Sequence, residues 1–222
     1  MSIDPGRNFK IWNYFLNHKE TLPTQRQDYP EWHRGRKHYA VWGIRINSQE
    51  VFSRIQSAQE HITEFLYSPY QRQPHVTLFV GGFLEKEKRF RDDYPIRQAE
   101  RHRRELLETQ LKPFQIDIGG MNSFASAPFL EVFDPAGGIA KIRKILSNPC
   151  PEIRQTPYRP HLTLGLYADT FETAQVAEHI TTFHAEERIN YFVQEIELMT
   201  YSAFEVAGPL KRKSVIHLQK EK

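Results

Sequence analysis

The stretches PHVTLF, at residues 74–79, and PHLTLG, at residues 160–165, share proline, histidine, an aliphatic residue, threonine and leucine in the same order. Their histidines, His75 and His161, lie 86 residues apart. A single His-x-Thr is common in β-rich proteins and carries little information. Two copies that match at five positions instead indicate an internal duplication, with one copy in each half of the chain.

Regular hydrophobic patterns surround the two copies in the same order. Period-2 alternation predicts strands, and apolar residues at helical spacing predict helices. We expect helices at 48–67, 96–111, 137–146 and 171–183, and strands at 39–46, 75–82, 114–120, 129–134, 161–167, 191–204 and 214–219. Each half then reads β-α-β-α-β with the repeated motif on its middle strand, which predicts an α+β fold of two pseudo-symmetric lobes. Their mainly antiparallel sheets would flank a central cleft.

The expected domain boundaries follow from this pattern. Residues 1–38 form an N-terminal extension, and residues 39–222 form one bilobal domain. Its lobes would span about 39–120 and 121–222, with the option that they exchange terminal strands. For the extension three alternatives are open: a lid over the cleft, a segment packed on the back of a lobe, or partial disorder.

The composition is that of an ordinary folded protein. The 222 residues are 39% apolar, 26% charged and 13% aromatic, with a formal net charge of +3. The only cysteine, Cys150, excludes an intramolecular disulfide framework and a cysteine zinc site. No segment approaches the roughly 20 apolar residues of a membrane span. We expect a cytoplasmic monomer without membrane contact.

Strand alternation assigns the motif residues to two faces. The histidine and threonine of each copy share one face, and the aliphatic residues share the other, where they can pack against helices. Two lobes placed together would let His75, Thr77, His161 and Thr163 line a common cleft. Phe79 would share the face of His75.

Such a cleft suits a phosphodiester. One neutral imidazole can remove a proton from an attacking water or hydroxyl, and the other, protonated, can donate a proton to the departing oxygen. The threonine hydroxyls can donate hydrogen bonds to the non-bridging phosphate oxygens. This chemistry requires neither a metal nor a cofactor.

The twin motifs, HVTL at 75–78 and HLTL at 161–164, resemble the signature of the two-histidine phosphoesterase superfamily. That group includes RNA 2′,3′-cyclic phosphodiesterases, also called 2′,5′-RNA ligases. The resemblance covers residues 39–219 and leaves residues 1–38 without a counterpart. It implies that His75 and His161 are the acid/base pair and that Thr77 and Thr163 hold the phosphate.

In members that open cyclic phosphates, the first histidine is usually assigned as the acid. The resemblance therefore implies acid His75, base His161 and a 2′-phosphate product, with RNA ends or small nucleotides as substrates. Two alternatives stay open: 2′,5′-phosphodiesterase or RNA ligase-type activity, and a non-catalytic nucleotide- or RNA-binding module.

Four further residues are candidates for substrate contact. Arg72 precedes the first motif, and Tyr158 and Arg159 precede the second. Arginine can pair with phosphate, and an aromatic ring such as that of Phe79 or Tyr158 can stack on a base. The alternative for each is packing or plain solvent exposure.

Overall fold

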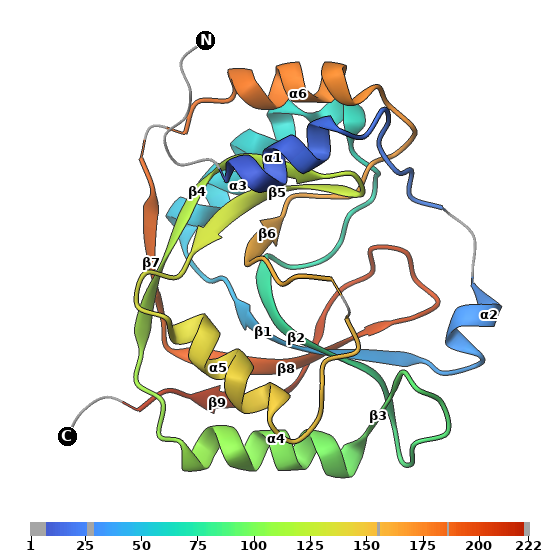
Figure 1. Cartoon of the computed structure of the whole chain (residues 1–222), viewed down its shortest axis with the longest axis vertical. Coiled ribbons are helices and arrows are strands. Elements are labelled where there is room, and N and C mark those ends of the chain that lie inside the picture. The colour runs from blue at the N-terminus through green and yellow to red at the C-terminus, as the bar shows by residue number, and fades with distance from the viewer. Residues whose placement is uncertain (1–7, 26–28, 155, 186, 220–222) are drawn as a thin grey trace.

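The structure is a computed structural model, and it describes residues 8–25, 29–154, 156–185 and 187–219. In these ranges nine strands form one curled sheet in the order β7-β4-β5-β6-β2-β1-β8-β9, with β3 paired to β2 (Figure 1). The β2–β3 pair is parallel, and the other pairs are antiparallel. The strands are β1 (His38–Arg45), β2 (His75–Glu85), β3 (Asp93–Pro95), β4 (Phe114–Phe124), β5 (Ala127–Phe133), β6 (His161–Thr163), β7 (Ile189–Val193), β8 (Glu195–Ser202) and β9 (Lys211–His217).

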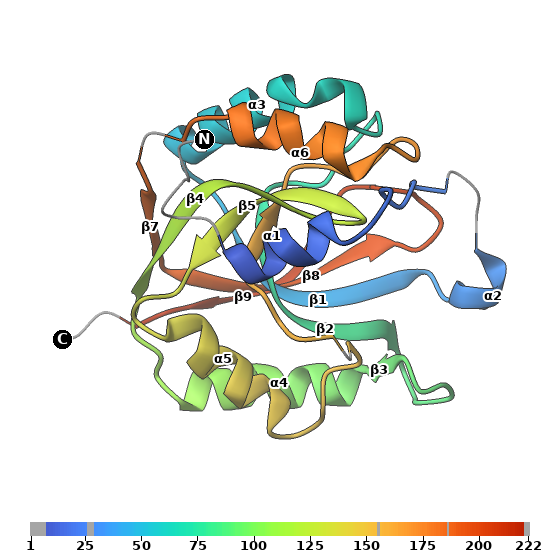
Figure 2. The same cartoon turned by 45° about the horizontal axis from the view of Figure 1, so that its top comes forward.

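The helices lie in two main groups against the sheet, apart from one short helix that precedes β1 (Figure 2). They are α1 (Phe9–Leu16), α2 (Pro30–His33), α3 (Gln49–His61), the 3-10 turn η1 (Thr63–Phe65), α4 (Ile96–Glu108), α5 (Gly138–Ser147) and α6 (Thr173–Thr182). Helices α4 and α5 pack together against the half of the sheet that contains β2 and β9, whereas α6 packs against β4 beside α3. No helix in the described ranges is long and apolar enough to cross a membrane.

The centre of the sheet is the antiparallel pair β2–β6, formed by the two motif strands. Val76 is paired with Leu162, and both side chains are fully buried. Three strands lie on each side of this pair along the sheet, β1-β8-β9 on one and β5-β4-β7 on the other. The aliphatic motif face therefore forms the core under the helices, as the alternation of residue types predicts.

The two halves of the chain exchange strands. Strand β4, from the first half, pairs with β5, and β8, from the second half, pairs with β1. The position between residues 120 and 121 consequently lies inside β4 rather than in a linker. The expected α+β fold with mainly antiparallel strands around the twin motifs is confirmed.

Most expected strands agree with the structure to within a few residues at each end, but two of them pair differently from the expectation. The strand expected at 161–167 ends at Thr163, because the next amide, that of Leu164, bonds to the Pro128 carbonyl outside the ladder. The strand expected at 191–204 is divided into β7 and β8, since β7 pairs with β4 and β8 pairs with β1. The chain passes from one half of the sheet to the other at Gln194.

The N-terminal extension is part of the core. Helix α1 begins after Asn8, whose side chain accepts a hydrogen bond from the Ile11 amide, as an N-cap does. Its residues Ile11, Trp12 and Phe15 are buried. The helix lies across β4 and β5 in both views (Figures 1 and 2).

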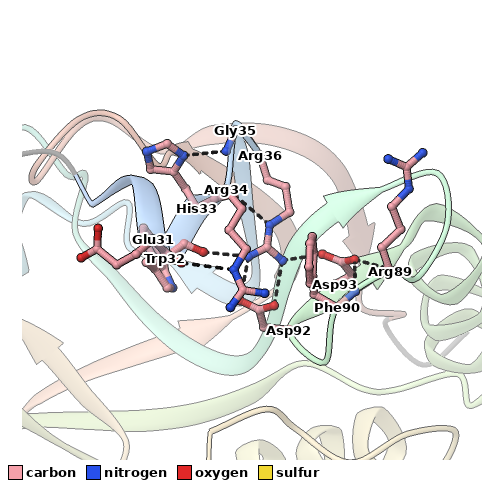
Figure 3. A network of polar contacts seen from close by, with 10 residues as sticks. All are labelled: Glu31, Trp32, His33, Arg34, Gly35, Arg36, Arg89, Phe90, Asp92 and Asp93. Carbon is pink, nitrogen blue, oxygen red and sulfur yellow. Dashed lines mark hydrogen bonds and ion pairs between the residues drawn. The ribbon is translucent and has the colours of Figure 1, made fainter.

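A buried ion cluster joins the end of the extension to the loop before β3 (Figure 3). The Arg36 guanidinium, 7% exposed, pairs with the carboxylates of Asp92 and Asp93 and donates to the carbonyls of Trp32 and His33. Burial disfavours the ionised form of Asp93, but hydrogen bonds from backbone amides and Arg36 dominate and lower its pKa. The cluster fixes the chain just before β1.

Candidate active site

The pairing of β2 with β6 brings the four motif side chains onto one face of the sheet. It places His75 across from Thr163 and Thr77 across from His161. Diagonal neighbours on such a pair lie roughly 7–8 Å apart, so both imidazoles can reach one small group between them. A local two-fold axis through the β2–β6 pair relates each histidine to the other and each threonine to the other.

Both imidazole rings are oriented by the same backbone contact. The His75 Nδ1–H donates to the Gln73 carbonyl at 2.9 Å, and the His161 Nδ1–H donates to the Arg159 carbonyl at 2.7 Å. A carbonyl only accepts, so Nδ1 carries the proton and Nε2 of each neutral ring has a free lone pair. Each Nε2 can therefore accept a proton or, once protonated, donate one.

Burial disfavours the protonated form of both rings in the free protein. It lowers the pKa of His75 to about 4, and the nearby Arg72, His161 and Arg45 act in the same direction. Burial also lowers the pKa of His161, with Arg154 contributing. An anion bound between the rings would favour their protonated forms and offset part of this effect.

A cavity of about 360 Å³ opens beside the first histidine. His75 and Thr77 line it together with Tyr39, Arg72 and Tyr201. The Arg72 guanidinium lies 4.0 Å from the centre of the Tyr201 ring, in cation–π geometry. The Arg72 Nε is buried and has no hydrogen-bond partner among the described residues.

A second cavity, of about 620 Å³, opens beside the other histidine. His161 and Arg159 line it, and Arg154 lines both this cavity and the first one. The His161 ring contacts the edges of Phe124 and Phe129, with centroids 5.0 and 5.4 Å away. The two histidines thus stand where two cationic cavities meet.

Phe79 does not line the cleft, contrary to the expectation from simple alternation. The ladder pairs Gly43 with Thr77 and Trp42 with Phe79, so one residue of β2 is skipped in a β-bulge. The bulge turns Phe79, 1% exposed, into the core and brings Val80 to the cavity face instead.

Side chains from the second half of the chain stabilise this bulge. The Arg143 guanidinium donates to the Leu78 carbonyl, and the Glu152 carboxylate accepts from the Val80 amide at 2.9 Å. Arg143 also pairs with Glu152 at 2.9 Å. The backbone groups of the bulge are therefore satisfied by a half-buried ion pair.

The other expected contacts fall in different places. Arg72 lies in the His75 cavity and Arg159 in the His161 cavity. Tyr158 instead donates its hydroxyl to the Thr77 carbonyl at 2.9 Å, and Arg143 covers its ring. Tyr158 lines neither cavity beside the histidines, so its contact is with the motif backbone.

Several residues of the two cavities were not expected from the sequence. Arg154 lies in an irregular loop, and no motif or periodicity distinguishes it from other arginines. Tyr201 belongs to the segment 191–204, for which the sequence predicts a strand and no functional role. Lys10 and Tyr14 come from the extension, where the helical spacing of Ile11 and Phe15 was the one available signal.

Metal-ligand side chains do not cluster in the described ranges. No group of three or more histidine, cysteine, aspartate or glutamate side chains is placed there to hold a metal ion.

Comparison with known proteins gives one family and a set of similar folds. The family model of the 2′-5′ RNA ligase superfamily matches residues 48–203. No curated protein sequence gives a significant match. Among solved structures, E. coli LigT complexed with 3′-AMP has a TM-score of 0.56 at 14% identity, over 83% of this chain and 99% of LigT. The protein TT0787 of Thermus thermophilus has a TM-score of 0.53 at 16% identity, over 83% of this chain and all of TT0787.

Proposed function

Since the chain belongs to the 2′-5′ RNA ligase superfamily, we propose that it is a phosphodiesterase that opens 2′,3′-cyclic phosphates at RNA ends or on nucleotides. The observation that carries the proposal is the β2–β6 register, which gives two imidazoles with free Nε2 atoms a common face. A nucleotide-bound relative of the same fold, LigT with 3′-AMP, is consistent with it.

The proposed reaction needs one proton on the histidine pair. The neutral imidazole removes a proton from water as the water oxygen bonds to phosphorus. The protonated imidazole gives its proton to O3′ as the P–O3′ bond breaks, which leaves a 2′-phosphate and a free 3′-hydroxyl. Family resemblance assigns His75 as the acid and His161 as the base. The local two-fold makes the geometry the same for the reverse assignment.

Charge on the phosphorane is stabilised from both strands. Neither threonine hydroxyl, on Thr77 or Thr163, has a hydrogen-bond partner in the described part of the chain, so both are free to donate to non-bridging oxygens. Arg72 and Arg154 add positive charge at the same face. Donors that are already oriented stabilise developing charge without reorganising.

A linear 2′,5′-linked diester is the second candidate substrate, and reversal of its cleavage would be ligation. One observation favours it: a cavity lies beside each histidine, so a nucleoside could be bound on either side of the phosphorus. Turnover of a 2′,3′-cyclic and a 2′,5′-linked dinucleotide, compared side by side, distinguishes the two.

The test of the proposal is hydrolysis in the presence of excess EDTA. Because both proton transfers are assigned to protein side chains, we expect the rate on a dinucleotide with a 2′,3′-cyclic phosphate end to change less than twofold. Phosphorus NMR should identify a 2′-phosphate product. Complete inactivity toward cyclic and 2′,5′-linked nucleotides, with tight nucleotide binding, would replace the proposal by a non-catalytic binding module.

A further inference from the structure

Part of the wall of the larger cavity is formed by residues that the family model does not cover. Its lining includes Lys10, Ile11 and Tyr14 of α1, opposite Phe124 and His161. Helix α1 precedes residues 48–203, the range that the family model covers. The shape of this cavity is therefore a property of this chain's extension.

The α1 wall is fixed rather than loosely attached. The Asn8 amide donates to the Glu131 carboxylate at 2.7 Å, and the Asn122 side-chain amide donates to the same carboxylate and to the Asn8 carbonyl. Glu131 is paired with His161 across β5 and β6. The start of α1 is consequently tied to the strand beside the second motif histidine.

The chemistry of the lining fits a single-stranded nucleotide segment. Lys10 and Tyr14 are exposed and one helical turn apart, so they face the same side of α1. Three cationic side chains line the cavity, those of Lys10, Arg154 and Arg159. No carboxylate among the described residues lines it. Cationic side chains with aromatic rings are what proteins use to bind phosphates and stack bases of single strands.

We propose that this cavity binds a second nucleotide unit, with Lys10 near its phosphate and Tyr14 and Phe124 near its base. Resting on the proposed function, this makes the substrate an oligonucleotide end whose terminal nucleoside carries the cyclic phosphate at the histidines and whose preceding nucleotide, attached through the 5′ oxygen of that nucleoside, binds in this cavity. Arg154, which lines both cavities, lies along the path between the two units. A cyclic mononucleotide would fill only one cavity.

The first arm of the test compares kcat/KM on a 2′,3′-cyclic mononucleotide with that on a dinucleotide bearing the same cyclic phosphate. Base stacking and one phosphate contact should favour the dinucleotide by about tenfold or more. Equal values, within twofold, would overturn the inference and leave the proposed function intact.

The second arm uses Lys10→Ala and Tyr14→Ala. Both side chains are exposed, so the core under α1 stays intact. Each should reduce the dinucleotide preference about fivefold or more. Lys141→Ala removes the same charge from an exposed position of α5 that lines neither cavity, and it should leave the preference unchanged. If Lys10→Ala and Tyr14→Ala leave the dinucleotide preference unchanged, as Lys141→Ala should, the inference is contradicted.

A measurement of RNA binding tests this inference without requiring that any substrate is hydrolysed. A five-nucleotide RNA with a 3′-phosphate is the probe, and its Kd is measured between 50 and 200 mM salt. Each phosphate contact adds about 0.7 to the slope of log K against log salt for a single strand, so Lys10→Ala should reduce that slope by about this amount. An unchanged slope would contradict the inference even if no substrate were hydrolysed.

Discussion

Replacing His75 or His161 by alanine should lower kcat/KM on a cyclic-phosphate dinucleotide by about 10³-fold or more. A positioned acid or base contributes roughly 10²–10⁴-fold, and here each variant removes one of the two proton-transfer groups. Because the imidazoles act on one phosphorus as a unit, the double variant should be little worse than either single variant. Initial rates on purified, folded variants give the comparison.

The control for this prediction is His217→Ala. His217 is an exposed histidine on β9 and lies in neither cavity. The activity of the His217→Ala variant should stay within twofold of the wild-type value. Retention of more than a tenth of wild-type activity by His75→Ala or His161→Ala would contradict the assignment of that residue.

Replacing Arg36 by methionine should lower the free energy of unfolding by about 3 kcal/mol. Removing one member of a buried ion pair leaves the other charge desolvated and unpaired, and here Asp93 is 4% exposed. For a chain of this length the midpoint of thermal unfolding should fall by about 6–12 °C. Denaturant titration and thermal melts at pH 7 provide the measurement.

Arg89→Met is the matched control for this change. The Arg89 backbone amide donates to the Asp93 carboxylate, but its side chain is exposed and extends away from the cluster (Figure 3). This variant should stay within about 0.5 kcal/mol of the wild type. Equal destabilisation by both substitutions would mean that the loss arises from the loop and not from the buried guanidinium.

The repeated motif predicted two strands that present a histidine and a threonine on one face, but it did not predict that these strands pair at the centre of one sheet. Val76 and Leu162 occupy equivalent positions of the two copies, and the structure pairs them with each other. Alternation then assigned the faces of His75 and His161 correctly relative to that pair. Both inferences depend only on local periodicity and on the presence of two copies.

Alternation failed at Phe79 for a physical reason that is not local. The bulge in β2 depends on Arg143 and Glu152, which satisfy the backbone of Leu78 and Val80 from more than 60 residues away in the sequence. No local pattern in HVTLFV reports such a partner. A bulge supported by distant side chains has to be seen in the structure.

The cavity walls were equally inaccessible to sequence patterns. Lys10 and Tyr14 reach the second cavity only because α1 packs across β4, and Arg154 does so from an irregular loop. Tyr158 is a candidate for substrate contact or for packing, and its hydroxyl bonds to the motif backbone. Tertiary packing positions such residues, and their spacing in the sequence does not reveal it.

The pH dependence of kcat/KM is the decisive test of the proposed acid/base pair, because it reports the protonation states of both histidines in the free protein. The active form carries one proton on the pair. Gain of a second proton at low pH and loss of the single proton at high pH should both lower the rate, and burial shifts both limbs toward acid because it lowers the pKa of His75 to about 4 and the pKa of His161 below its ordinary value. We expect a bell-shaped profile with its maximum on the acidic side of neutrality. A rate that is flat from pH 4 to 8, or that rises continuously with pH, would contradict it.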